Sequence, residues 1–128
     1  MNLKHLSNLS NAELNALAAT NIYGWTSCRS PFQAKGDTDE IFWRTPRGEM
    51  RKRAFTPATD RNQSGELLTA MMERGACFTV GFWPDGAKVT WWPERRAGSL
   101  GKVVPGTSPR SETIAALCAW FAMEELSQ

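Results

Sequence analysis

The chain has 128 residues, with 15 lysines and arginines against 13 aspartates and glutamates. This length suits a single domain over residues 1–128, and a hydrophobic share of 41% excludes a wholly disordered chain. No apolar run approaches the roughly 20 residues that a membrane span needs. We therefore expect no membrane partner.

The residue types that usually carry catalysis or hold metals are scarce. Cys28, Cys77 and Cys118 lie far apart in the sequence, and His5 is the single histidine. A structural zinc site needs four nitrogen or sulfur ligands, and catalytic cysteines and serines usually need a histidine base. We expect reduced, mostly buried thiols in a cytoplasmic protein that is not an enzyme. We expect no catalytic residue, no metal site and no cofactor.

The first predicted helix spans about residues 11–22. Ser10 and Glu13 have the spacing of a capping box, which satisfies two free amide donors at a helix start, and Gly24 is a suitable end. Residues 26–53 give a weaker signal, with a short strand near 41–43 between two turns. Both a hairpin and a long surface loop fit this segment within the domain.

Two further helices and a hairpin follow. Asp60 is a good N-cap for a helix over about 61–74, and alternating residues then predict a hairpin over about 76–92, with its turn at Pro84-Asp85-Gly86. Residues 102–104 suggest a short edge strand. Ser108 and Pro109 begin a helix over about 109–125.

This order predicts an α+β domain in which a small antiparallel sheet is sandwiched between three amphipathic helices. The alternation places Phe78, Val80, Phe82, Val89 and Trp91 on one face of the hairpin. Trp83 and Trp92 share the opposite face, where they are either exposed for binding or covered by a helix. We expect Trp91 and Trp25 in the core.

Positive charge is concentrated in one segment. Residues 44–53 hold five cationic side chains and Glu49, a net charge of +4, so the rest of the +2 chain carries −2. Aromatic side chains beside cations are typical of surfaces that bind nucleic acids, and basic patches also bind acidic proteins. The alternative is a loop kept soluble by its charge. The candidate binding residues are Arg44, Arg47, Arg51, Lys52, Arg53, Trp43, Trp92, Arg95 and Arg96.

Two other segments are weaker candidates. Gly98–Lys102 is rich in glycine and serine, but no ordinary strand precedes it and no helix follows at once, as a phosphate-binding loop requires. Asp37, Asp39 and Glu40 form a small acidic cluster without the further ligands that Mg²⁺ usually needs. We interpret both segments as surface loops.

Three blocks of sequence together resemble one known family. The blocks are Ser10–Leu17 with Tyr23–Trp25, Phe55–Asp60, and Gly106–Pro109 with Ile114–Cys118. Their order is similar to that of the phage ABA-sandwich domain family. The resemblance implies a sheet between helix layers, a phage or prophage origin, and structural roles for Trp83 and Trp92. It implies no catalytic residues.

These observations lead to two functional hypotheses. The first is a non-enzymatic phage accessory protein in the cytoplasm of a bacterial host, which binds and modulates or inhibits a host defence factor. That partner is a protein or a protein–nucleic-acid complex. The alternative is a protein that binds nucleic acid or a nucleotide through the basic and aromatic surface. The oligomeric state stays open, and a small homo-oligomer is one option.

Overall fold

A computed structural model describes residues 1–29, 41–94 and 100–126 of the chain. The helical elements are α1 (Leu3–Ser7), α2 (Asn11–Leu17), a π-helical turn η1 (Ala18–Ile22), a 3₁₀ turn η2 (Lys52–Ala54), α3 (Arg61–Glu73) and α4 (Pro109–Leu126). The strands are β1 (Thr26–Cys28), β2 (Phe42–Thr45), β3 (Gly48–Arg51), β4 (Cys77–Trp83), β5 (Gly86–Trp92) and β6 (Lys102–Pro105). The expected α+β class is confirmed.

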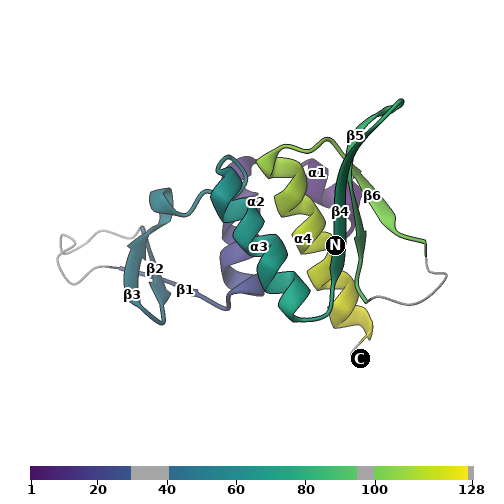
Figure 1. Ribbon diagram of the computed structural model, residues 1–128. Coiled ribbons are helices and arrows are strands. Elements are labelled where there is room, and N and C mark those ends of the chain that lie inside the picture. Colours follow the sequence, from purple (N-terminus) through teal and green to yellow (C-terminus); the bar gives the residue numbers. More distant parts are fainter. Residues whose placement is uncertain (30–40, 95–99, 127–128) are drawn as a thin grey trace.

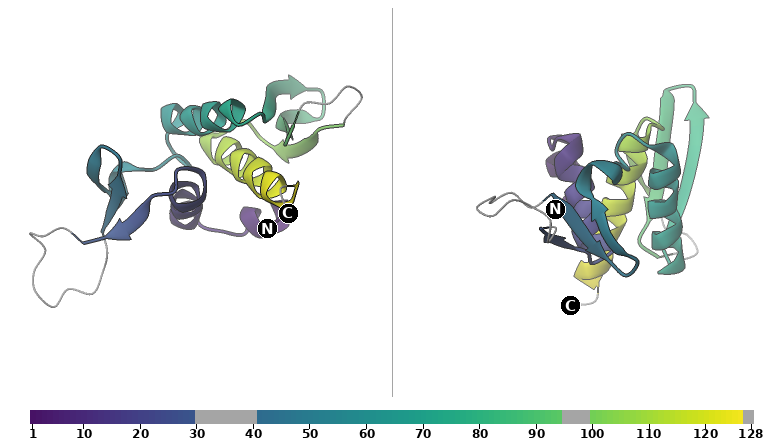
Figure 2. Two further views of the ribbon diagram at one scale, coloured as in Figure 1. Left: turned by 90° about the horizontal axis from the view of Figure 1, so that it is seen from below. Right: turned by 90° about the vertical axis from the view of Figure 1, so that its left-hand side faces the viewer.

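In the described part of the chain, the strands form two antiparallel sheets of three, in the orders β1-β2-β3 and β4-β5-β6. Figure 1 shows one sheet at each end of the molecule, with the helices between them. The view from below in Figure 2 places β1–β3 beside α2 and far from β4–β6. Of the two options left open for residues 26–53, the structure shows a β2–β3 hairpin paired with β1.

The helices occupy one face of sheet β4–β6, which differs from the expected sheet with helices on both sides. Val89 and Trp91 of β5 are buried on the face that meets α4. The opposite face carries Cys77, Thr79, Gly81 and Trp83 of β4, which pair with Trp92, Thr90, Lys88 and Gly86 of β5. No described helix covers this face (Figure 1), and Trp83 there is 50% exposed.

The predicted helix starts are confirmed by their caps. The Ser10 hydroxyl accepts the Glu13 N–H at 3.1 Å, and the Ser10 N–H donates to the Glu13 carboxylate at 3.2 Å. The Asp60 carboxylate accepts the Gln63 N–H at 3.0 Å at the start of α3. Such caps satisfy amide donors that have no partner inside the helix. They explain why α2 and α3 begin where they do.

The core is centred on α4. Its residues 111–119 are all buried, which is possible because α4 packs against α3 on one side and against β5 and β6 on another. Leu67 and Met71 of α3 and Leu117 of α4 are among the fully buried side chains. The Arg110 guanidinium donates to the carbonyls of Ser7 and Leu9, at 3.0 and 2.6 Å, and so ties α1 to α4.

The turn end of the β4–β5 hairpin extends past the helices (Figure 1). Val80 and Phe82 lie on the same face as the buried Val89 and Trp91, as the alternation predicts. They are nevertheless 44% and 83% exposed. Phe82 is next to the turn end, which the helices do not reach (Figure 1), and Val80 lies on the edge strand.

Candidate binding surface

The β2–β3 pairing decides which candidate residues face solvent. Trp43 lies opposite Met50, Arg44 opposite Glu49, and Phe42 opposite Arg51. Because neighbouring residues of a strand point to opposite faces, Trp43 and Met50 share one face while Arg44 and Arg51 share the other. Arg44 and Arg51 are diagonal neighbours on that second face, and both are exposed.

Trp43 is a core residue. It is only 4% exposed and belongs to the hydrophobic core cluster. The Lys52 ammonium lies 4.4 Å from the centre of the Trp43 ring and donates to the Ser27 hydroxyl. Lys52 therefore stabilises the sheet as well as carrying charge. The large apolar area of an indole favours this burial over a role in stacking.

Four arginines remain as an exposed basic set, which we call the arginine surface: Arg44, Arg47, Arg51 and Arg53. The ion pairs in the described part of the chain are Arg61–Glu112 and Lys88–Asp85. No member of the arginine surface is therefore in an ion pair with a described carboxylate. Their charges are available to a ligand or partner.

A hollow of about 360 Å³ lies at one end of this surface. It is lined by Ile41, Arg51, Lys52 and Arg53, and Ile41 is 46% exposed. The Arg51 guanidinium also lies 5.9 Å from the centre of the Phe42 ring. An apolar side chain surrounded by cations suits a partner that combines carboxylates with an apolar group.

A larger groove of about 630 Å³ lies beside Arg47, where the β2–β3 turn faces the segment after η1 and α3. The Tyr23 and Trp25 rings stack at 4.8 Å, and the Phe55 ring meets Trp25 edge-on at 4.9 Å. Burial raises the pKa of the Tyr23 hydroxyl, and the nearby Glu66 carboxylate adds to the rise. The groove is lined by Tyr23, Trp25, Thr45, Pro46, Arg47, Met50, Ala54, Phe55, Gln63 and Glu66.

Sequence reasoning did not identify this groove. Its walls come from four separate segments that only the fold brings together, so no local pattern marks it. Gln63 shows how the segments are held: its side chain accepts the Thr56 N–H at 2.6 Å and donates to the Ala54 carbonyl at 2.9 Å. These bonds fix the chain that enters α3 and thereby position Phe55.

The remaining candidates do not join the arginine surface. Trp92 belongs to sheet β4–β6, at the other end of the molecule from β1–β3 (Figure 1). It is partly buried and lies over Gly101, where an added Cβ would come within 2.6 Å of the indole. Arg95 and Arg96 lie outside the described residues. The weak phosphate-loop and acidic-cluster candidates also fall wholly or partly outside them.

The remaining tryptophans divide between core and surface. Trp91 is 5% exposed, which confirms its predicted place in the core, and Trp25 and Trp120 are partly buried against that core. Trp83 is 50% exposed. Its indole lies over Gly81 and 5.6 Å from the Lys88 ammonium.

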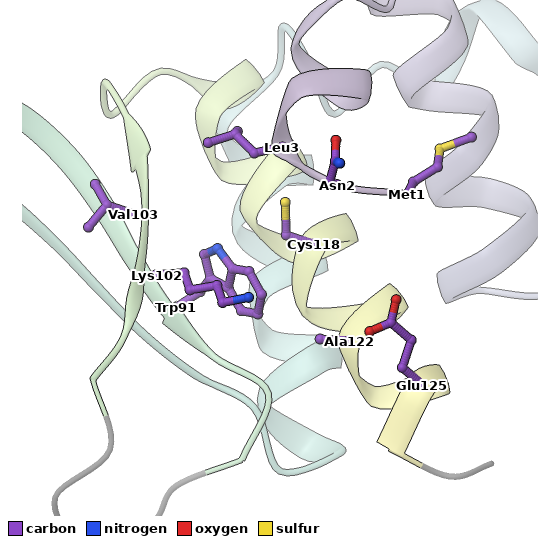
Figure 3. A pocket seen from close by; sticks show the side chains of 9 residues that line it. All are labelled: Met1, Asn2, Leu3, Trp91, Lys102, Val103, Cys118, Ala122 and Glu125. Carbon is purple, nitrogen blue, oxygen red and sulfur yellow. The ribbon is translucent and has the colours of Figure 1, made fainter.

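Cys118 lines a separate pocket of about 290 Å³ between the N-terminal segment, β5–β6 and α4 (Figure 3). Burial raises the pKa of its thiol to about 11, so at neutral pH it is a weak nucleophile. The His5 ring is 3.1 Å from the Asn2 side-chain oxygen. Among the described residues, no group of three or more histidines, cysteines, aspartates or glutamates is placed to hold a metal ion.

Comparison with protein-family models, curated proteins and solved structures found no match to this chain. The resemblance to the phage ABA-sandwich family therefore gains no support and stays a prediction. None of the helices in residues 1–29, 41–94 and 100–126 is long and apolar enough to cross a membrane.

Proposed function

We propose that the protein is a non-enzymatic binding protein whose arginine surface binds an acidic surface of a host protein and modulates or inhibits that protein. The resemblance to phage ABA-sandwich proteins supplies the proposed setting, a phage accessory protein in the cytoplasm of a bacterial host. A host defence factor is the proposed class of target.

One observation carries this proposal. Arg51 and Arg53 line a hollow with the exposed Ile41, and no described carboxylate pairs with either arginine. Specific protein interfaces combine buried apolar contacts with a charged rim, and Arg is enriched in them. Opposite charges on a partner also speed association.

The burial of Trp43 favours a protein partner over single-stranded nucleic acid. Proteins that bind single strands without sequence preference stack bases on exposed aromatic side chains beside a basic groove. Trp43 is 4% exposed, and Phe42 lies under the Arg51 guanidinium. The aromatic rings of β2 are thus a buried indole and a partly buried phenyl ring that already contacts Arg51.

The test compares two variants of equal charge change in affinity capture from bacterial lysate. Arg44→Glu/Arg51→Glu reverses two charges on the arginine surface. Lys4→Glu/Lys102→Glu reverses two exposed charges elsewhere in the chain. We expect a host protein that binds the wild type and the control pair, and is lost with the arginine pair. Direct titration of the purified partner should reproduce this difference. A partner that both pairs retain would count against the proposal.

Binding to nucleic acid is the second candidate, because four exposed arginines without described carboxylate partners also suit phosphates. Titration of labelled single- and double-stranded DNA and RNA at several salt concentrations distinguishes the two. Phosphate binding predicts a plot of log K against log salt with a slope of several units. No binding at low salt would eliminate this candidate.

A further inference from the structure

The outer edge of β4 has the features of a pairing surface. In the order β4-β5-β6, β4 pairs with β5 on one side only within the described residues. Its seven residues, Cys77–Trp83, include no charged residue and no proline. Edge strands that stay unpaired are usually short, charged, bulged or interrupted by proline, because free backbone groups otherwise recruit another strand.

The other edge of the same sheet shows this protection. β6 is four residues long and contains both Lys102 and Pro105. Val103 of β6 is 41% exposed, close to the 44% of Val80 in β4. The two edges thus differ in length, charge and proline content while presenting a similar exposed valine. Only the β4 edge continues into strongly exposed aromatic side chains, Phe82 at 83% and Trp83 at 50%.

We propose that β4 pairs with β4 of a second copy of this chain, in an antiparallel register centred on Val80, to form a continuous six-stranded sheet. The sheet end of the molecule lies away from the arginine surface (Figure 1), so this inference does not rest on the proposed function.

The sequence of β4 is self-complementary in this register. A two-fold axis through Val80 places Val80 opposite Val80 of the second copy. The same axis places Phe78 of each copy opposite Phe82 of the other. These residues share one face of the strand, so each pair meets on the same side of the sheet. Phe78 is partly buried against the core, and Phe82 of the second copy would cover it. On the other face, Gly81 lies opposite Thr79.

The area is consistent with a second copy as the occupant. Covering the exposed parts of Val80, Phe82 and Trp83 in both copies, with the neighbouring backbone, buries on the order of 1,000 Å². That area is near the lower limit of specific interfaces, so we expect a dimer that dissociates on dilution.

The first test is sedimentation equilibrium of the full chain across a concentration series. We expect a dimer for the wild type. Val80→Lys places two ammonium groups against each other at the axis, and it should raise the dissociation constant on the order of tenfold or more. Phe82→Lys should act in the same direction at a position that is already exposed. Val103→Lys is the matched control on the β6 edge and should leave the dimer unchanged.

The second test fixes the register. Directly opposed residues of antiparallel strands have Cβ atoms about 4.5–5.5 Å apart. In a Cys77→Ser background, Val80→Cys should therefore form a disulfide-linked dimer on mild oxidation, and Val103→Cys should not. A wild type that stays monomeric at all concentrations would overturn the proposal. So would a dimer that is insensitive to both lysine variants at β4 and gives no Val80→Cys cross-link.

Discussion

Arg61 and Glu112 form an ion pair at 3.1 Å that joins the first turn of α3 to the first turn of α4. The Glu112 side chain is only 8% exposed, whereas that of Arg61 is 60% exposed. The Ser64 hydroxyl donates to the same carboxylate oxygen at 2.9 Å, and Arg61 also donates to the Thr107 carbonyl at 2.7 Å. Among the described residues, this buried carboxylate thus has two partners, both from α3.

Arg61→Ala should therefore lower the free energy of unfolding by about 1–3 kcal/mol. The substitution leaves the buried Glu112 carboxylate with the Ser64 hydroxyl as its one described partner. Because the Arg61 side chain is largely exposed, the loss of unfolding free energy should be smaller than for a fully buried ion pair. Urea unfolding measures the difference. Asn62→Ala, at the next and exposed position of α3, is the control and should change stability by less than about 0.5 kcal/mol. Equal losses in the two variants would contradict this account.

Gly101→Ala and Gly65→Ala should change stability in opposite directions. A Cβ at Gly101 would lie 2.6 Å from the Trp92 indole and would also contact the Thr90 methyl group, so this variant should lose about 1–3 kcal/mol. A Cβ at Gly65 meets nothing within 4 Å in the interior of α3. That variant should gain about 0.5–1 kcal/mol from helix propensity. Thermal unfolding of both compares them directly, and a shift of the same sign in both would be incompatible with the packing of Trp92 on Gly101.

Much of the fold follows from signals within a few residues of each other. The Ser10–Glu13 capping box, the Asp60 cap and the turn signal of Pro84-Asp85-Gly86 each act over short distances, so α2, α3 and the β4–β5 hairpin are predictable. The loop itself is Pro84 and Asp85, because Gly86 already pairs with Trp83. Strand alternation also assigns Phe82 to the correct face. Its exposure depends instead on how far the helices extend beneath the hairpin, which no local pattern records.

The candidate surface was less predictable, because its residues are sorted by contacts between distant segments. In the sequence, Trp43, Arg44, Arg51 and Lys52 all belong to one basic and aromatic segment. In the structure, the Lys52 ammonium packs on the Trp43 ring, whereas Arg44 and Arg51 face solvent. The groove beside Arg47 likewise forms only where the segment after η1, the β2–β3 turn and α3 meet. Such contacts depend on packing, which composition and charge do not specify.

Cys118 should resist alkylation until the protein is at high pH. Its pKa is raised to about 11, so its thiolate fraction at pH 8 is on the order of one in a thousand. Cys77 is partly exposed and should react first with iodoacetamide. Mass spectrometry of the alkylated peptides measures the order, and labelling of Cys118 before Cys77 at pH 8 would contradict it.

The same raised pKa links Cys118 to stability at alkaline pH. A thiol whose pKa is higher in the folded protein than in the unfolded chain stabilises the fold fully below the unfolded value, about 9. That contribution is lost as the pH rises through about 11. Cys118→Ala should therefore show a shallower fall in unfolding free energy between these pH values than the wild type. If plots of unfolding free energy against pH were parallel for the two proteins, the Cys118 thiol would not contribute to the pH dependence of stability.

Lys52→Met should destabilise the fold more than a matched change at an exposed arginine of the same basic segment. The Lys52 ammonium lies 4.4 Å from the Trp43 ring and donates to Ser27, so its removal should cost about 1 kcal/mol of unfolding free energy. Arg53→Met is the matched control: its side chain is exposed and in no described ion pair, so the change should stay within about 0.5 kcal/mol. The summed tryptophan emission should shift more in the Lys52 variant than in the Arg53 variant, because the Lys52 ammonium lies 4.4 Å from the centre of the Trp43 ring. A larger loss of stability in Arg53→Met than in Lys52→Met would contradict the assignment of Lys52 to the folded core around Trp43 and of Arg53 to the arginine surface.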